Sequence, residues 1–302
     1  MRPVFEWQIG SRALQLGKRT LIMGVVNVTP DSFSDGGLHL DPESAVAHAL
    51  QLVADGADII DIGGESTRPG ATVIASAGAS ASSSGTKVAV SEREELDRVI
   101  PVIASLRRKR SNVVISVDTY KAAVARAAVE AGAQIVNDVS GFRWDSRMAK
   151  TLAELKCGAV LMHMRGRPEE WRTLPPVADI VTLIKRELRE RADAALMAGV
   201  KRDRLVLDPG FGFGKNHEGN YPLLKRFAEF HDLRYPLMAG VSRKSFIGRA
   251  LARDGKDAGI PDRLYGTLAA ETAAILKGAH VIRTHDVKAC ADAVRIADIV
   301  VS

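Results

Sequence analysis

Polar side chains that could bind a ligand follow several short apolar runs in this chain. The first run, Leu21–Val26, is rich in branched apolar residues, which is typical of a strand buried on both faces. The residues that come directly after such runs include Asn27, Asp118, Asn137 and Asp208. Ligand sites of α/β proteins lie where parallel strands end, so these side chains indicate one shared site.

Cationic side chains follow other apolar runs, where they could bind a phosphorylated or otherwise anionic group. They are Arg68, Arg243, Lys244, Arg283 and His285. The carboxylates and amide of the first set could pair with the hydrogen-bond donors of a flat heterocycle. Asn27 supplies a neutral oxygen, which suits a Mg²⁺ ion that bridges phosphate oxygens. No HExxH, CxxC or DxD ligand set occurs, which argues against a tightly bound transition metal.

Two loops have compositions that favour ligand binding. Gly24–Gly37, GVVNVTPDSFSDGG, continues from the first apolar run into a polar stretch too long for a simple turn. Asp208–Lys215 reads DPGFGFGK; its glycines allow close backbone approach and its two phenylalanines offer flat apolar faces. It is not a nucleotide-binding P-loop, because that motif needs a hydroxyl residue where Asn216 stands.

The elements that must position these residues alternate regularly from Leu21 onward. Apolar strands alternate with amphipathic helices in eight units, and glycines stand at many helix ends. This pattern predicts an α/β fold, a (β/α)8 TIM barrel, preceded by a short N-terminal β-hairpin at Val4–Gln8 and Ala13–Leu16. A doubly wound sheet is the alternative, but no glycine-rich dinucleotide fingerprint follows the first strand.

The predicted barrel strands are Leu21–Val26, Ile59–Ile62, Val113–Val117, Ile135–Val136, Ala159–Met162, Leu205–Leu207, Leu237–Ala239 and Val281–Ile282. The predicted helices are Pro42–Asp55, Glu92–Arg110, Lys121–Ala131, Arg147–Lys156, Val177–Ala198, Tyr221–Phe227, Leu264–Lys277 and Val287–Val300.

The composition is that of an ordinary globular protein. The 302 residues are 46% hydrophobic and 26% charged, and we expect one domain over residues 1–302. No apolar run approaches the roughly 18 residues of a membrane span, and the N-terminus lacks the apolar core of a signal peptide. Cys157 and Cys290 have no metal-ligand spacing. We therefore expect a cytoplasmic protein without a membrane segment.

The net charge of +6 includes one dense basic cluster, Arg107–Arg110. The cluster closes a predicted helix, Glu92–Arg110, whose first turns are acidic, and this polarity complements the helix dipole. Aromatic residues make up only 5% of the chain and do not alternate with basic residues. We expect the cluster to be a solvated helix end and expect no nucleic acid partner.

Ordered motifs over nearly the whole chain resemble those of the dihydropteroate synthases, pterin-binding enzymes of the folate pathway that sulfonamides inhibit. The motifs are Met23–Gly37, Gly63–Gly70, Ser116–Thr119, Asn137–Gly141, Leu161–Met164, Asp208–Lys215, Ser242–Gly248 and Arg283–Val287. One short motif can arise by chance, whereas an ordered set of this size is highly specific.

The resemblance implies condensation of 6-hydroxymethyl-7,8-dihydropterin diphosphate with 4-aminobenzoate, which gives 7,8-dihydropteroate and pyrophosphate. It implies that the pterin is bound by Asp118, Asn137, Met162, Asp208 and Lys244. It implies that the diphosphate is bound by Asn27, Arg68, Arg283 and His285, with Asn27 acting through Mg²⁺. It implies that the 4-aminobenzoate pocket is formed by Phe33, Thr67, Pro69, Phe213 and Ser245. The residues expected to serve catalysis are Asp118, Lys244, Arg68 and Asp208.

The sequence leaves several points open. A methyltetrahydrofolate:corrinoid methyltransferase would share the pterin carboxylates without needing the diphosphate cluster. A degenerate, non-catalytic paralogue would lack the catalytic set, which is complete here. The main departure from the family pattern is Ala71–Val90, an Ala/Ser/Gly-rich insertion that we expect to be flexible. His163 either packs as a structural residue, which we favour, or contacts substrate. The family usually forms homodimers through late helices, and we expect a homodimer here, although the sequence does not identify its surface.

Overall fold

The computed structural model of this chain describes residues 2–29, 41–65, 90–171 and 173–301. Phe33, Thr67, Arg68 and Pro69 lie outside these ranges, as does the predicted insertion except for Val90.

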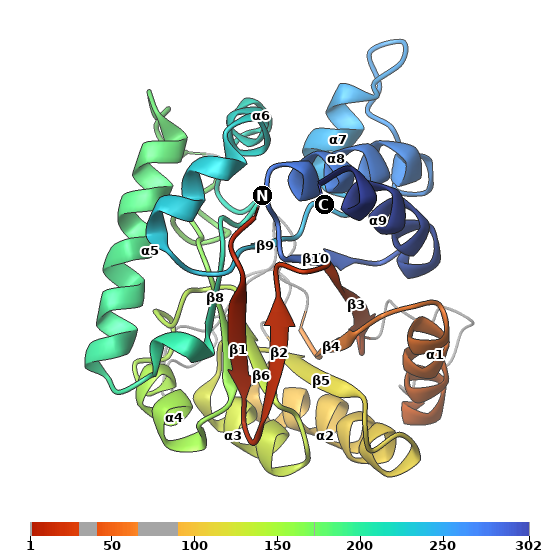
Figure 1. The fold of residues 1–302 in the computed structure, drawn as a ribbon, viewed down its shortest axis with the longest axis vertical. Helices are drawn as coiled ribbons and strands as arrows, with labels where there is room; N and C mark the ends of the chain where they lie inside the picture. Colours follow the sequence, from red (N-terminus) through yellow and green to blue (C-terminus); the bar gives the residue numbers. More distant parts are fainter. Residues whose placement is uncertain (1, 30–40, 66–89, 172, 302) are drawn as a thin grey trace, which may run out of the picture.

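The chain begins with an antiparallel hairpin, β1 (Phe5–Ile9) and β2 (Arg12–Leu16). Parallel strands then form an eight-stranded sheet in the order β8-β7-β6-β5-β4-β3-β10-β9. A bridge between Leu207 of β8 and Leu237, next to β9, joins the two ends of this sheet. The strands therefore close into a barrel surrounded by helices (Figure 1), which confirms the predicted (β/α)8 fold with its N-terminal hairpin.

The barrel strands are β3 (Leu21–Asn27), β4 (Ile59–Gly63), β5 (Val114–Asp118), β6 (Ile135–Asp138), β7 (Gly158–Met162), β8 (Leu205–Asp208), β9 (Met238–Ala239) and β10 (Val281–Thr284). The α-helices are α1 (Pro42–Ala54), α2 (Glu92–Lys109), α3 (Ala122–Glu130), α4 (Met148–Leu155), α5 (Ile180–Met197), α6 (His217–Lys225), α7 (Ser245–Ala250), α8 (Leu264–Leu276) and α9 (Val287–Val301). Short 3₁₀ helices are η2 (Arg202–Arg204), η3 (Phe227–Leu233) and η4 (Pro261–Arg263).

The hairpin covers the amino-terminal end of the barrel. Trp7, Ile9 and Leu16 are fully buried against the first residues of the strands, such as Leu21 of β3. The Trp7 indole N–H also donates to the Arg204 carbonyl oxygen at 2.9 Å, so this large side chain is both packed and satisfied. With one end covered in this way, the carboxyl ends of the strands are left for ligands.

Capping residues fix where several helices begin. Ser91 and Glu94 form a capping box at the start of α2. Asp179 caps α5, which therefore begins at Ile180 rather than at the predicted Val177. Asn216 caps α6 by accepting from the Gly219 N–H.

Several predicted boundaries were wrong. Helix α6 begins at His217, four residues before the predicted start, because the Asn216 cap precedes it. The chain from Phe227 onward forms η3 rather than the end of that helix. Helix α7 was not predicted, since its six residues are too few to show a helical period.

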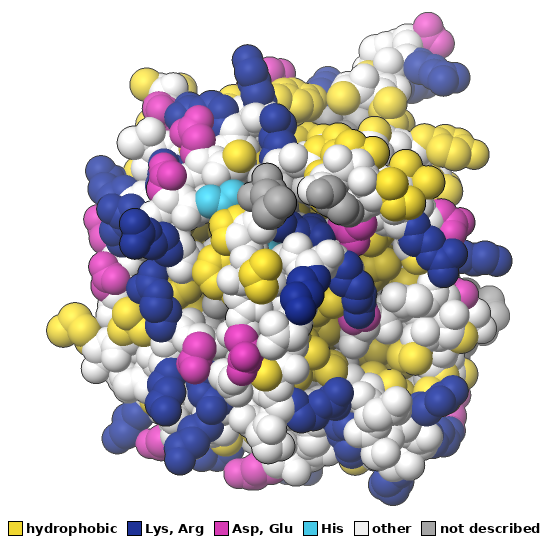
Figure 2. All heavy atoms as spheres, in the orientation of Figure 1, with side chains coloured by type: hydrophobic (Ala, Val, Ile, Leu, Met, Phe, Trp, Pro, Cys, Tyr) yellow, Lys and Arg dark blue, Asp and Glu magenta, His cyan; other side chains and the backbone are white. Residues whose placement is uncertain are grey.

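The basic cluster at the end of α2 is engaged with other parts of the chain. Arg107 donates to the Gly132 carbonyl oxygen at 2.7 Å, and Lys109 pairs with Glu43. Over the face shown in Figure 2, Lys and Arg side chains are interspersed with Asp and Glu. Within the described ranges, no helix is long and apolar enough to cross a membrane. Cys157 and Cys290 are buried free thiols.

Candidate active site

A cavity of about 250 Å³ opens at the carboxyl ends of the barrel strands. Its lining includes Asn27 of β3, Asp118 of β5 and Arg283 of β10, together with the loop residues Lys244 and His285. These residues are far apart in the sequence and meet because a parallel barrel collects its strand ends on one rim. The cavity is therefore the candidate active site.

A smaller cavity lies beside the first and shares Asp118, Lys244 and Arg283 with it. The five residues that the sequence assigned to the pterin all line this smaller cavity: Asp118, Asn137, Met162, Asp208 and Lys244. Strands β6 and β10 run further than predicted, and they include Asn137 and Arg283, respectively. The fold brings the set together, and its role toward a ligand remains a prediction.

Arg283 joins two carboxylates at the centre of the site. Its Nε donates to Asp61 Oδ2 at 2.7 Å, and its Nη2 donates to Asp118 Oδ2 at 2.7 Å. The Asn137 side-chain amide also donates to Asp61 Oδ2, at 3.0 Å. One guanidinium thus offsets two buried carboxylates, and the network fixes Asp118 and Asn137 relative to each other.

Asp61 is a residue of this network to which the sequence gave no role. It lies inside β4, fully buried, between Ile60 and Ile62. Its carboxylate makes its two hydrogen bonds, to Arg283 and Asn137, through Oδ2. A charged residue within an apolar strand is the signal that could have identified it, because a buried carboxylate needs a partner of opposite charge.

Burial raises the pKa of two carboxyl groups in the smaller cavity. It raises the pKa of Asp118 to about 7; Arg283 opposes this rise and Asp61 adds to it. Burial also raises the pKa of Asp208 to about 6. The Gly210 N–H, which donates to Asp208 Oδ1 at 2.7 Å, opposes this rise. Carboxyl groups that titrate near neutral pH are typical of functional sites.

The glycine-rich loop after β8 folds back over the end of β7. Gly210 has a φ of +70°, and a Cβ there would lie 1.9 Å from the His163 carbonyl oxygen, so only glycine fits. The buried Lys215 ammonium donates to the carbonyl oxygens of His163, Pro209 and Gly210. The lysine binds backbone oxygens, which agrees with the exclusion of a P-loop.

The aromatic end of the larger cavity is formed by Phe213, with Ser245 nearby in its lining. Lys244 Nζ lies 3.9 Å from the centroid of the Phe213 ring, and Trp171 packs edge-on against the same ring. Phe211 is instead fully buried and stacks on Phe227 in the core. Only one of the two loop phenylalanines therefore presents its ring to the larger cavity.

His285 and Ser242 lie at the polar end of the larger cavity. Ser242 Oγ and His285 Nδ1 are 3.0 Å apart. Burial, together with the nearby Arg283, lowers the pKa of His285 to about 3, so its imidazole is neutral at physiological pH. This side chain can therefore donate a hydrogen bond to an anion without itself carrying charge.

Arg243 does not supply a free cation to the cavity, contrary to the expectation from the sequence. Its guanidinium binds both carboxylate oxygens of Asp286. Its backbone N–H donates to Thr267 Oγ1 at 3.0 Å, and its φ is +57°. Arg243 therefore fixes the loop that presents Ser242 and Lys244.

Comparisons with known proteins decide the family. Residues 23–285 match the family described as pterin binding enzyme. Over 281 residues the chain is 43% identical to the dihydropteroate synthase of Escherichia coli K12, covering 93% of this chain and 92% of that protein. The chain belongs to the dihydropteroate synthase family.

Solved structures of dihydropteroate synthases share the fold. The Xanthomonas albilineans enzyme with 4-aminobenzoic acid gives a TM-score of 0.86 at 43% identity, covering 99% of both chains. The same enzyme in complex with 7,8-dihydropteroate gives a TM-score of 0.82 at 40% identity, covering 98% of this chain and 99% of that one. These relatives support the dihydropteroate synthase hypothesis rather than the corrinoid methyltransferase alternative.

His163 is a packed residue in this member of the dihydropteroate synthase family. It is fully buried, and its Nε2 lies 3.0 Å from Glu187 Oε2 on α5. Burial, with Lys215 and Arg191 nearby, lowers its pKa well below the usual value. It lines neither of the two cavities, which supports the structural interpretation.

Mg²⁺ has one predicted protein ligand in this family member, Asn27. Across the part of the chain that the structure describes, no group of three His, Cys, Asp or Glu side chains could hold a metal ion. Asn27 offers a neutral oxygen at the larger cavity, which Glu65 and Asp118 also line. The single amide oxygen of Asn27 fits Mg²⁺ that keeps waters and is bound largely through substrate phosphates.

Proposed function

We propose that this chain is a transferase that condenses 6-hydroxymethyl-7,8-dihydropterin diphosphate with 4-aminobenzoate, forming 7,8-dihydropteroate and pyrophosphate. One observation carries the proposal: in a member of the dihydropteroate synthase family, three polar residues at different strand ends and a lysine from the loop after β9 line one cavity. They are Asp118, Asn137, Asp208 and Lys244. Convergent carboxylates, an amide and an ammonium suit a flat ring with donors and acceptors along its edge.

The pterin occupies the smaller cavity in this proposal. The carboxylates of Asp118 and Asp208 accept hydrogen bonds from the ring's N–H groups, and Asn137 adds an amide. Lys244 donates to a ring acceptor, and Met162 packs against the ring face. Support comes from the shared lining of these residues and from the buried, apolar character of the remaining wall.

The diphosphate lies in the larger cavity, near Asn27, Arg68, Arg283 and His285. Arg283 acts from between its two carboxylate partners, and the neutral His285 donates a hydrogen bond. Asn27 would hold Mg²⁺ together with phosphate oxygens. When bound, this ion neutralises charge on the departing pyrophosphate.

4-Aminobenzoate binds beside the pterin, against Phe213 and Ser245 and with Phe33, Thr67 and Pro69. The Xanthomonas albilineans relative with bound 4-aminobenzoic acid supports this part of the proposal. Sulfonamides carry the same arylamine, so we expect them to compete with 4-aminobenzoate for this pocket.

The reaction needs electrostatic stabilisation rather than a protein nucleophile. The bond between the pterin methylene carbon and the diphosphate oxygen breaks, and pyrophosphate leaves. The pterin ring delocalises the positive charge that develops on the methylene carbon, and the Asp118 carboxylate stabilises it. The arylamine nitrogen then attacks the carbon and loses a proton. Ser242 and Ser245 therefore bind substrate or support the site and do not act as nucleophiles.

The proposal is tested by measuring 7,8-dihydropteroate and pyrophosphate together, with each substrate omitted in turn. We expect both products in equal amounts when both substrates are present, and no dihydropteroate when either substrate is missing. Pyrophosphate release that depends on neither substrate, or no dihydropteroate with both substrates present, would contradict it.

We also propose that the chain forms a homodimer in the cytoplasm, through α8 and α9. These helices lie side by side (Figure 1) and expose apolar side chains. Tyr265 is 83% exposed on α8, and Ile296 and Ile299 are 66% and 74% exposed on α9. Neighbouring exposed apolar groups of this size favour association with a second copy.

A further inference from the structure

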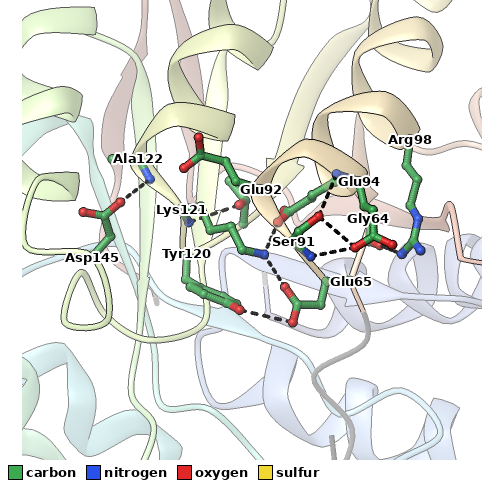
Figure 3. A network of polar contacts seen from close by, with 12 residues as sticks. Gly64, Glu65, Ser91, Glu92, Glu94, Arg98, Tyr120, Lys121, Ala122 and Asp145 are labelled. Atoms are coloured by element: carbon green, nitrogen blue, oxygen red, sulfur yellow. Dashed lines mark hydrogen bonds and ion pairs between the residues drawn. The ribbon is translucent and has the colours of Figure 1, made fainter. Parts of the chain in front are cut away.

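A buried charged cluster lies beside the candidate active site and contains none of the predicted substrate-binding residues. Lys121, Glu65 and Glu95 expose only 8%, 6% and 1% of their side chains. Lys121 Nζ contacts Glu65 Oε2 and Glu95 Oε2, each at 2.5 Å, and Figure 3 shows the lysine reaching Glu65. Glu65 also lines the larger cavity, together with Asn27 and Asp118. The cluster therefore borders the site directly.

The cluster joins three elements next to Asp118. Glu65 follows β4, Glu95 lies in the first turn of α2, and Lys121 comes just before α3, three residues after Asp118. Gly63 of β4 pairs with Asp118 of β5, and a Cβ on Gly63 would lie 3.3 Å from the Asp118 Cβ. One ammonium thus links the segments that follow the paired ends of β4 and β5.

Tyr120 connects the cluster to the apolar wall of the smaller cavity. Its hydroxyl donates to Glu65 Oε1 at 3.1 Å (Figure 3), and Lys121 Nζ lies 4.5 Å from its ring centroid. The same ring packs edge-on against Trp144, in an apolar cluster that includes Met162. A displacement of Glu65 would therefore move Tyr120 and disturb the apolar cluster that includes Met162, in the wall of the smaller cavity.

The charges of the cluster also act on Asp118. Burial raises the pKa of Glu65, and Lys121 opposes the rise. Of the cluster, Glu95 of α2 raises the pKa of Asp118, as do Asp61 of β4 and Asp138 of β6, whereas Arg283 of β10 lowers it. Loss of the ammonium would leave two buried carboxylates unpaired, and nearby negative charge disfavours the ionised form of Asp118.

We propose that Lys121 is a positioning residue of the pterin subsite: its ammonium holds the ends of β4 and β5 together and neutralises Glu65 and Glu95 beside Asp118. This inference rests on the proposed function, in which Asp118 binds the pterin. Lys121 acts through Asp118 and Glu65 and contacts no substrate.

Calorimetric binding of 6-hydroxymethyl-7,8-dihydropterin as a function of pH tests the inference without requiring turnover. Lys121→Met is expected to weaken binding about tenfold at alkaline pH, where Asp118 is ionised, because the strand ends lose their link. The pH at which affinity falls on the acid side is expected to rise by about half to one unit, because uncompensated negative charge raises the pKa of Asp118. Lys121→Arg keeps both ion pairs and should stay within about threefold of wild type.

Two further variants keep the test interpretable if Lys121→Met folds poorly. The triple variant Glu65→Gln, Glu95→Gln, Lys121→Met removes all three buried charges. It should bind the pterin weakly, because the link is lost, but without the upward shift in pH. Arg2→Met breaks another buried ion pair, with Asp298 at the opposite end of the barrel. It should lower thermal stability and leave the pterin affinity unchanged.

Wild-type affinity and wild-type pH dependence in folded Lys121→Met, or wild-type affinity in the triple variant, would overturn the inference. A wild-type protein that binds the pterin but forms no dihydropteroate contradicts the proposed function alone, and the binding data still test Lys121. A wild-type protein that does not bind the pterin overturns both.

Discussion

Asp118 stands between a guanidinium and further carboxylates, and this environment determines its chemistry. Arg283 donates to it, while Asp61, bound to the same guanidinium, opposes its ionisation. Burial raises the pKa of Asp118 to about 7, so the group can exist in either form near neutral pH. A carboxylate held in this way is ready to stabilise a cation that forms beside it, because its neighbours do not need to reorganise.

Asp118→Asn removes that charge while keeping the shape of the side chain. We expect kcat to fall by about 100-fold or more, since preorganised charge stabilises the transition state. We expect thermal stability to be maintained, because Arg283 still forms its ion pair with Asp61 and one fewer carboxylate is buried. Steady-state kinetics and a thermal melt measure both. Asp232→Asn, which loses only an exposed partner of Lys185, serves as the matched control. Near-normal turnover in folded Asp118→Asn would contradict the proposal that the Asp118 carboxylate stabilises the pterin cation.

Whether a site residue could be predicted depended on where it lies in its strand. Asp118 and Asp208 were identifiable because a polar residue that ends an apolar run stands out. Asp61 was not assigned, since it lies within the run and its partner Arg283 is brought to it only by barrel closure. Lys121 was missed because a lysine near a helix start usually lies in solvent, and only tertiary structure buries it between two glutamates.

At the scale of elements, the β8–α6 loop depends on backbone conformations that only glycine adopts freely. Gly210 combines a positive φ with a close approach to the His163 carbonyl oxygen, whereas Gly255 has a φ of +75° and no atom near its would-be Cβ. Substituting alanine at Gly255 therefore measures the destabilisation caused by the left-handed backbone conformation alone. The same substitution at Gly210 adds the destabilisation caused by the steric clash.

Gly210→Ala is expected to destabilise the protein by more than about 3 kcal/mol and to weaken pterin binding, because a methyl group cannot fit beside the carbonyl. Gly255→Ala should cost only about 1 kcal/mol, the price of the left-handed conformation. Chemical denaturation gives both values. Equal costs for the two variants would contradict the close approach at Gly210.

Helix α8 contains a buried acid that should make stability depend on pH. Glu271 is fully buried, and burial raises its pKa to about 7, with Thr284 nearby opposing the rise. In the unfolded chain its pKa is about 4.3. A raised folded-state pKa stabilises the fold at low pH, and this contribution is lost as pH rises from about 4 to about 7.

Glu271→Gln should therefore gain stability relative to wild type as pH rises through that range, by about 4 kcal/mol in all once the pH is above 7. Thermal melts of both proteins at several pH values measure the difference. Glu190→Gln, at an exposed position on α5, should show no such trend. A difference between Glu271→Gln and wild type that stays constant with pH would contradict the raised pKa.

At the scale of the whole molecule, the hairpin covers one end of the barrel, the candidate site occupies the other, and α8 and α9 lie on the side. The barrel, its hairpin and the rim of polar strand ends were predictable, because they depend on local apolar periodicity and topology. The boundaries of α6 and α7 were not, since caps and very short helices leave little periodic signal. The proposed dimer surface could be located only once side-chain exposure was known.

Ile299→Glu should shift the protein from dimer toward monomer, because a charge at a buried apolar contact costs more than the contact contributes. Sedimentation velocity over a range of protein concentrations measures the shift. Met197→Glu, at a position on α5 that is 90% exposed, is the matched control and should leave the assembly unchanged. A monomeric wild type, or a dimer unaffected by Ile299→Glu, would contradict the proposed surface.

In the proposed reaction the bond between the pterin methylene carbon and oxygen breaks, and a bond from this carbon to the arylamine nitrogen replaces it. Substrate labelled with ¹⁸O at the oxygen that joins this carbon to phosphorus tests this cleavage directly, by mass analysis of the products. We expect the label to appear in pyrophosphate, one atom for each dihydropteroate formed. Label that stays with a hydroxymethylpterin would show cleavage at phosphorus and would contradict the proposed reaction.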